Sequence, residues 1–81
     1  MKIHELKTWP VFFEAIADGS KRWEYRKNDR KFKRGDMLEL QEYSPTKEVY
    51  TGNKMTVEVG KVWQQLPGMP TDYCIMDITR L

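Results

Sequence analysis

The chain has 81 residues, 40% hydrophobic and 32% charged, and this length allows one small domain with a thin hydrophobic core. Its three Trp, four Tyr and three Phe argue against disorder, and its single cysteine excludes an internal disulfide or a cysteine-based zinc site. The sequence has no apolar run of about 18 residues and does not begin with the pattern of a signal peptide. It therefore predicts a soluble, cytoplasmic protein without a membrane span.

The N-terminal part predicts a strand followed by a helix. The alternation in "KIHEL" is typical of a short strand. The segment "TWPVFFEAIADG" predicts a helix, with Thr8 as its N-cap, Pro10 in its first turn and Gly19 at its C-terminal stop. Apolar residues recur three and four positions apart and form one stripe, made of Trp9, Phe12, Phe13 and Ile16.

After Gly19 the apolar period changes from 3.6 to two. "KRWEYRK" alternates Trp23 and Tyr25 with charged residues, which predicts a half-buried strand with Trp23 in the core. A basic loop, "KNDRKFKR", follows, with Phe32 as its expected anchor and residues 34–36, "RGD", as its turn.

The C-terminal half predicts three more strands. The three strands are DMLELQEY, KMTVEVGKVWQQ and DYCIMDITRL. A hairpin connection, SPTKEVYTGN, joins the first strand to the second, and a loop, LPGMPT, joins the second to the third. Leu38 and Leu40 are expected to point inward, and Cys74 is expected to be a small core residue. Gly60 interrupts the alternation of the long middle strand and predicts a bulge.

This order of elements predicts an α+β, mainly β domain over residues 1–81. A thin core is most simply closed by curling the sheet into a small barrel, because a barrel leaves no exposed strand edges. The N-terminal helix is then expected to cover one opening of the barrel.

The segment "GSKRWEYR" has the pattern G-x-K-x-x-E-x-R, formed by Gly19, Lys21, Glu24 and Arg26. This pattern resembles the signature of ASCH (activating signal cointegrator homology) domains, relatives of the PUA RNA-binding domains. The opening "HELKTWP" together with "RKND" is similar to a subgroup of short ASCH-like proteins of bacteria and phages. The resemblance covers nearly the whole chain and implies a small PUA-like β-barrel with a cleft between the helix and the barrel.

The same resemblance implies that the cleft binds RNA or another nucleotide-like ligand. Lys21 would contact a phosphate or a polar base edge, and Glu24 and Arg26 would form a paired floor that orients the ligand. In the alternative interpretation the Glu24–Arg26 pair is structural and binds no ligand. Polar residues on the outer face of a strand are commonly only solvated. Trp9 starts the helix that would border the cleft, so it is either a stacking platform or a core residue.

Positive charge is concentrated between Lys21 and Arg34, where eight basic and two acidic residues give +6 in a chain whose total is +2. Such a block attracts polyanions, and phosphate contacts supply most non-specific nucleic-acid affinity. The loop residues expected to bind RNA are Lys27, Arg30, Lys31, Lys33 and Arg34. Alternatively the loop only keeps the domain soluble, with Phe32 anchored in the core instead of stacking on a base. The RNA-binding interpretation requires the loop to lie beside the cleft.

An enzyme is the alternative function. Some small ASCH-like proteins are amidohydrolases of N4-acylated cytidines, which use the signature lysine, a threonine three positions later and a glutamate before the last strand. This chain keeps Lys21 but has Glu24 in place of the threonine, and the short "QQLPGMPTD" offers only Asp72. Two of the three parts are therefore absent, and the resemblance does not transfer this activity. The alternative that stays open is a different hydrolytic chemistry on N-acylated nucleosides, carried by Lys21 with Glu24. A protein-interaction module is a third interpretation.

No residue pattern indicates a metal or a cofactor. His4 has no neighbouring histidine or cysteine, and Glu5, the nearest carboxylate, points to the other side of a strand. We therefore expect no metal site, no cofactor and no catalytic histidine.

Overall fold

Five strands and one helix follow one another in the order that the sequence predicts. The computed structural model describes residues 1–81, and its elements are β1 (Ile3–Thr8), α1 (Pro10–Ala17), β2 (Trp23–Lys27), β3 (Met37–Ser44), β4 (Val49–Trp63) and β5 (Tyr73–Arg80). The eight-residue α1 is far too short to cross a membrane, and the chain has no longer helix.

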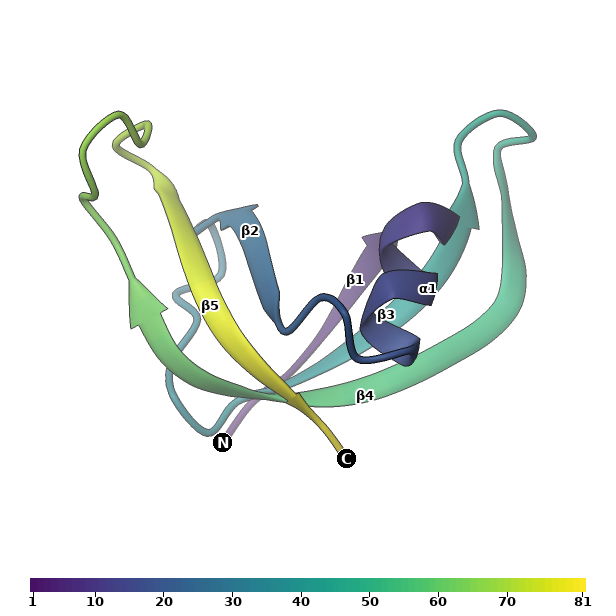
Figure 1. Cartoon of the computed structure of the whole chain (residues 1–81), viewed down its shortest axis with the longest axis horizontal. Coiled ribbons are helices and arrows are strands. Elements are labelled where there is room, and N and C mark those ends of the chain that lie inside the picture. Colours follow the sequence, from purple (N-terminus) through teal and green to yellow (C-terminus); the bar gives the residue numbers. More distant parts are fainter.

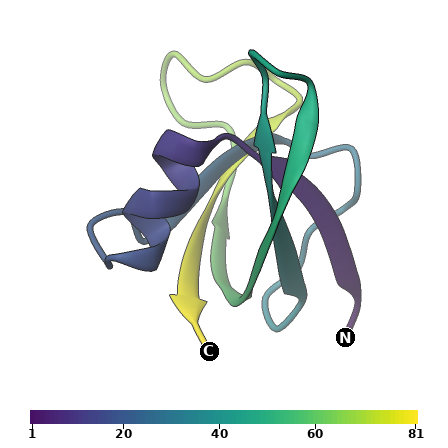
Figure 2. The same cartoon turned by 90° about the vertical axis from the view of Figure 1, so that its right-hand side faces the viewer.

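The strands form one sheet in the order β1-β3-β4-β5-β2. β1 runs parallel to β3, whereas the other neighbouring pairs are antiparallel. The sheet curls strongly, so that Figure 1 shows two arms rising from a common base, with α1 inside the curve. Seen from the side, the strands run roughly alongside one another, and α1 lies to one side of them (Figure 2). This confirms the predicted small, mainly β architecture with one helix, in the form of a half-barrel whose two edges are β1 and β2.

The core is built from the inward faces of the strands. Leu38, Leu40, Val57, Cys74 and Met76 are fully buried, as the alternation of their strands requires. The helix and the basic loop each insert one apolar side chain into this core, Ile16 and Phe32 respectively. Phe32 is therefore the anchor of the loop, and the prediction that Cys74 packs in the core is confirmed.

The helix differs from the prediction at its start. It begins at Pro10 and has Trp9 at its N-cap, without a side-chain hydrogen bond. Thr8, the predicted cap, is the last residue of β1, and its side chain is buried. Gly19 follows the helix with a φ of +86°, a left-handed conformation that glycine adopts at little cost. The predicted helix stop is thus confirmed, and the predicted cap is wrong.

The predicted hairpin connection before β4 is too long. The sequence places "VYTGN" in the connection, but β4 already starts at Val49. Gly52, with a φ of +95°, lies within this strand, where the pairing with β3 shifts between Gln41 and Tyr43. The Gly-Asn pair therefore makes an irregularity in a long strand and not a turn. A second shift, between Val59 and Val62, confirms the bulge predicted at Gly60.

Candidate functional site

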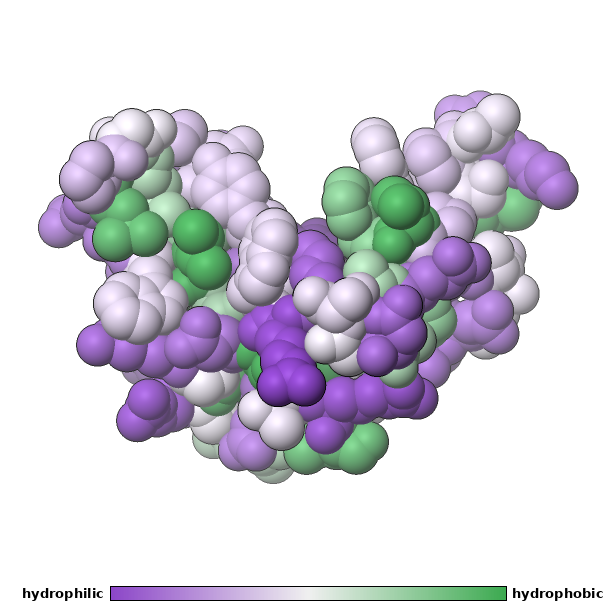
Figure 3. All heavy atoms as spheres, in the orientation of Figure 1, coloured by the Kyte–Doolittle hydropathy of each residue, from purple (hydrophilic) through white to green (hydrophobic).

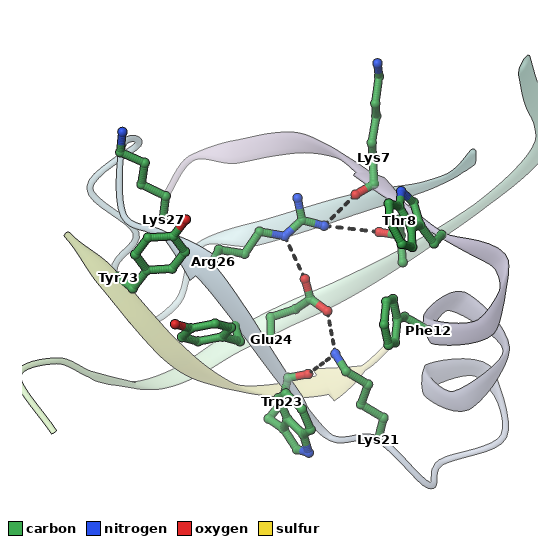
Figure 4. A pocket seen from close by; sticks show the side chains of 11 residues that line it. Lys7, Thr8, Phe12, Lys21, Trp23, Glu24, Arg26, Lys27 and Tyr73 are labelled. Carbon is green, nitrogen blue, oxygen red and sulfur yellow. Dashed lines mark hydrogen bonds and ion pairs between the residues drawn. The ribbon is translucent and has the colours of Figure 1, made fainter. Parts of the chain in front are cut away.

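Three side chains of the signature meet at Glu24. The Nζ atom of Lys21 donates to Oε1 of Glu24 over 2.7 Å, and Nε of Arg26 donates to Oε2 over 2.8 Å (Figure 4). Lys21 precedes β2, while Glu24 and Arg26 share one face of that strand. Both carboxylate oxygens are thus bonded to a cation, and the group as a whole carries one surplus positive charge.

This polar face of β2 points inward, opposite to the prediction. Glu24 is only 4% exposed, whereas Trp23 and Tyr25 are 47% and 45% exposed. The period of two is as predicted, but the assignment of Trp23 to the core is wrong. The reversal is possible because Lys21 and Arg26 compensate the buried carboxylate, which would otherwise lose its hydration without a partner.

Arg26 also connects β2 to β1, the opposite edge of the half-barrel. Its NH2 group donates to the carbonyl oxygen of Lys7 over 2.6 Å and lies 3.4 Å from the hydroxyl oxygen of Thr8 (Figure 4). Its NH1 group makes no hydrogen bond within the chain. Lys21 is held by a second bond, from Nζ to the carbonyl oxygen of Trp23 over 2.6 Å. The floor of the site is therefore rigidly arranged, with one guanidinium nitrogen left to bind a ligand.

Aromatic side chains form the walls of a cleft of about 450 Å³ around this floor. The aromatic lining residues are Trp9, Phe12, Trp23, Tyr25 and Tyr73. Trp9 and Phe12 stack on the helix side at 6.3 Å between ring centroids, and Tyr25 and Tyr73 stack on the β2–β5 side at 5.2 Å. Figure 3 shows the hollow between the two arms of the molecule. Trp9 is exposed and lines the cleft, so it is not a core residue.

The basic loop contributes only one cation to the cleft. Lys27, at the end of β2, lines it. Arg30 instead donates from NH1 to the carbonyl oxygen of Glu5 over 2.7 Å, and Lys31 is exposed with a φ of +52°. Lys33 and Arg34 border a different hollow. The loop as a whole therefore does not line the cleft, because Phe32 draws its middle into the core.

Sequence reasoning missed part of the lining. Six lining residues are not predicted from the sequence: Lys7, Thr8, Phe12, Trp23, Tyr25 and Tyr73. Tyr73 reaches the cleft because β5 pairs with β2, with Lys27 opposite Tyr73. That pairing joins residues 46 positions apart in the sequence, so no local sequence pattern predicts it.

His4 has a carboxylate partner that the sequence did not suggest. Its Nε2 lies 3.0 Å from Oδ2 of Asp36, and both side chains are buried. Burial by itself would raise the pKa of Asp36, but hydrogen bonds from His4 and from the backbone N–H groups of Lys2 and Lys33 outweigh it and lower this pKa. The pair lies outside the residues that line the cleft.

The structure holds no cluster of three or more His, Cys, Asp or Glu side chains that could bind a metal ion. Burial raises the pKa of the Cys74 thiol, which keeps it protonated and makes it a poor nucleophile. The cleft and its charged floor are therefore the candidate site.

Fold and cleft together define a small half-barrel protein with an aromatic-walled cleft over a charged floor. The chain belongs to the family described as "Domain of unknown function (DUF3850)", whose model matches residues 3–78. It is also 41% identical, over 61 residues, to the "Uncharacterized 12.9 kDa protein in GpA 3'region" of Escherichia phage P2. That match covers 75% of this chain but 54% of the phage protein, so the chain spans about half the length of this relative.

A solved structure shares the whole fold. The crystal structure of the hypothetical protein PH0355 superposes with a TM-score of 0.64 and covers all of both chains, at 19% sequence identity. At this identity the similarity establishes the architecture alone.

Proposed function

We propose that the protein binds single-stranded RNA, and that one nucleotide of the strand enters the cleft. The observation that carries this proposal is the combination of aromatic walls with a positively charged floor whose Arg26 NH1 group is unoccupied. Bases stack on aromatic side chains with roughly 1–3 kcal/mol each, and this contact is available only where the bases are unpaired. Lys27, at the rim, is suited to an adjacent phosphate.

The resemblance of the signature to ASCH domains supports the same function. Its Lys21, Glu24 and Arg26 are joined by hydrogen bonds inside one cleft, next to α1, which is the arrangement that a PUA-like RNA-binding domain would need. We therefore propose that the family is related to the ASCH and PUA-like domains. A cytoplasmic location suits an RNA partner and a chain with one reduced, buried cysteine.

No feature of the cleft favours the amidohydrolase alternative. Lys21 already donates to Glu24 and to the carbonyl oxygen of Trp23, and Arg26 occupies the second oxygen of Glu24. A hydrolytic pair needs a free base within reach of the substrate. These bonds instead suit a rigid binding floor.

The proposal is tested by titrating a fluorescein-labelled single-stranded RNA of about 12 nucleotides, a length within the usual range for small single-strand-binding domains. Tyr25→Ala removes one cleft wall, and we expect binding to weaken about 5- to 150-fold, as the loss of one stacking contact implies. Tyr50→Ala is the matched control, because Tyr50 is 51% exposed, does not line the cleft and packs against Tyr43; its one contact with a lining residue is a distant one, 5.8 Å from its ring centroid to Nζ of Lys7.

Affinity should also fall linearly on a plot of log K against log salt, because phosphate contacts release counterions. Equal affinities of the two alanine variants, or no binding of RNA by the wild type at low salt, would contradict the proposal.

A further inference from the structure

A second hollow, of about 400 Å³, lies outside the cleft and is lined by three cations. Its residues are Phe32, Lys33, Arg34, Lys61, Val62 and Gln64, with no acidic side chain among them. We call this depression the cationic hollow, after its cations Lys33, Arg34 and Lys61. Lys61 comes from β4 and lies far from the basic loop in the sequence, so its position there depends on the fold.

The backbone positions these cations. The N–H of Gly35 donates to the carbonyl of Val59, and the N–H of Val59 donates to the carbonyl of Asp36, both over 2.8 Å. These bonds hold the end of the loop against β4. The bulge then follows at Gly60, which is packed so closely that a Cβ there would lie 3.3 Å from Cβ of Asp77. Bulges commonly redirect a side chain, and here the next residue, Lys61, lines the cationic hollow.

The charges of the cationic hollow are available to a ligand. The three ion pairs of the molecule involve His4–Asp36 and the Glu24 cluster, and none includes Lys33, Arg34 or Lys61. Their side chains also make no hydrogen bond; Lys61 has only a cation–π contact, its Nζ lying 4.3 Å from the ring centroid of Trp63. Three uncompensated cations around one depression attract a phosphate group.

A third hollow connects the cationic hollow to the cleft. It is lined by Lys27, Asn28, Asp29, Gln64, Thr71 and Asp72. Lys27 is shared with the cleft and Gln64 with the cationic hollow, so the third hollow borders both of the others, and we call the three together the path. Asp29 and Asp72 repel phosphate in the middle of the path, which confines the phosphate contacts to its two ends.

We propose that the cationic hollow binds a phosphate of the same RNA strand whose base occupies the cleft. This rests on the proposed function for the identity of the partner. It adds that the partner is a strand several nucleotides long and not a free nucleotide, because a single nucleotide reaches only one end of the path.

The test compares a single-stranded RNA of about 12 nucleotides, long enough for such a domain, with the dinucleotide UpU, which occupies the cleft alone. The double variant Lys33→Gln/Lys61→Gln removes two charges from the cationic hollow. Lys47→Gln/Lys54→Gln removes the same charge from the turn and the strand at the other end of the molecule, outside the path. Affinities are measured by fluorescence anisotropy for the long RNA and by NMR titration for UpU.

We expect the Lys33/Lys61 variant to bind the long RNA about tenfold more weakly, with a salt slope reduced by about 1.4, while its affinity for UpU is unchanged. The Lys47/Lys54 control should lose little for either ligand. If the Lys33/Lys61 variant binds the long RNA as the control does, or loses both ligands equally, the second site is refuted. In the first case the cleft proposal still stands as long as Tyr25→Ala weakens binding, whereas a wild type that binds neither RNA refutes the proposed function itself.

Discussion

Glu24 is the residue on which the candidate site depends. An ionised carboxylate buried without partners costs several kcal/mol, and the cost is recovered only when good hydrogen bonds satisfy its oxygens. Lys21 and Arg26 supply these bonds at 2.7 and 2.8 Å. In turn, Glu24 holds the two cations in fixed positions, so that Lys21 and Arg26 do not have to be ordered when a ligand arrives.

We expect Glu24→Gln to destabilise the fold. The amide leaves Lys21 and Arg26 facing each other without a compensating negative charge, in side chains that are only 11% and 25% exposed. Removing one partner of a fully buried ion pair costs roughly 3–5 kcal/mol, and the partial exposure of Arg26 should place this variant at or below the lower end of that range. The measurement is the urea midpoint of unfolding.

Glu14→Gln makes the same chemical change on the exposed side of α1, where the Glu14 side chain has no partner, and should leave the midpoint unchanged. An equal midpoint for both variants would mean that Glu24 contributes nothing to stability.

Residue-level inference from the sequence succeeded where a local rule applies. Gly19 and Gly60 were placed correctly because a helix stop and a bulge each require a particular backbone conformation or a close contact. The inward face of β2 was assigned wrongly because hydrophobicity favours Trp23 over Glu24. What reverses that preference is a set of contacts to Lys21, Lys7 and Thr8, and these become visible only when β1 and β2 are placed side by side.

At the level of elements, the loop between β2 and β3 is held at three points. The N–H of Phe32 donates to the side chain of Asn28 over 2.9 Å, and the Phe32 ring is buried. Asp36 then accepts hydrogen bonds from the N–H of Lys33, the N–H of Lys2 and the ring of His4. A loop with four basic residues is thereby fixed against β1 and β4, which presents its cations in defined places.

The lowered pKa of Asp36 predicts a loss of stability in acid. Because the folded protein binds this proton less readily than the unfolded chain, whose value is near 3.8, ionised Asp36 stabilises the fold above about pH 4, and this contribution is lost as the pH falls through the lower folded value. We expect the free energy of unfolding, measured by urea titration, to fall below about pH 4. Asp36→Asn should be less stable at neutral pH and should show a smaller fall in acid.

Asp29→Asn, in the same loop but with an exposed side chain and no bond, should follow the wild type at every pH. Part of the fall should persist in Asp36→Asn, since the Ser20 side chain and N–H also lower the pKa of Asp18. A wild-type pH profile in Asp36→Asn would contradict the role assigned to Asp36.

The elements themselves were largely predictable, with one informative exception. Alternating residues define β3 and β5, and the pattern survives because one face of each strand packs in the core. β4 was shortened in the prediction because Gly52-Asn53 is a frequent turn pair. In the structure the turn lies earlier, and Glu42 bonds to the side chains of Thr51 and Asn53, which keeps this segment in the sheet. That contact crosses between strands and is not encoded in the local pair.

For the whole molecule, the open side of the half-barrel is its most consequential feature. β1 and β2 are sheet edges, and no backbone ladder joins them. Successive backbone groups of a strand alternate in direction, so Glu5 and Lys7 both turn their carbonyls away from β3. Arg30 binds the first of these carbonyls and Arg26 the second. In a full barrel these carbonyls would accept hydrogen bonds from a neighbouring strand. Here two guanidinium groups donate those bonds instead, and the space between β1 and β2 stays open for the cleft.

This arrangement predicts that the main role of Arg30 is to stabilise β1 through its bond to the Glu5 carbonyl, and not to bind RNA. Arg30→Gln should lower the free energy of unfolding by about 1 kcal/mol, the usual contribution of one hydrogen bond, because the Glu5 carbonyl can then be hydrated instead. Hydrogen exchange should locate the effect, with faster exchange of the β1 amides that bond to β3 and no change in the amides shared by β4 and β5. Arg34→Gln, an arginine of the same loop without such a bond, should leave exchange in β1 as it is in the wild type. If instead Arg30→Gln weakened RNA binding while β1 exchanged at its normal rate, Arg30 would be a ligand-binding residue and the opening between β1 and β2 would be held by Arg26 alone.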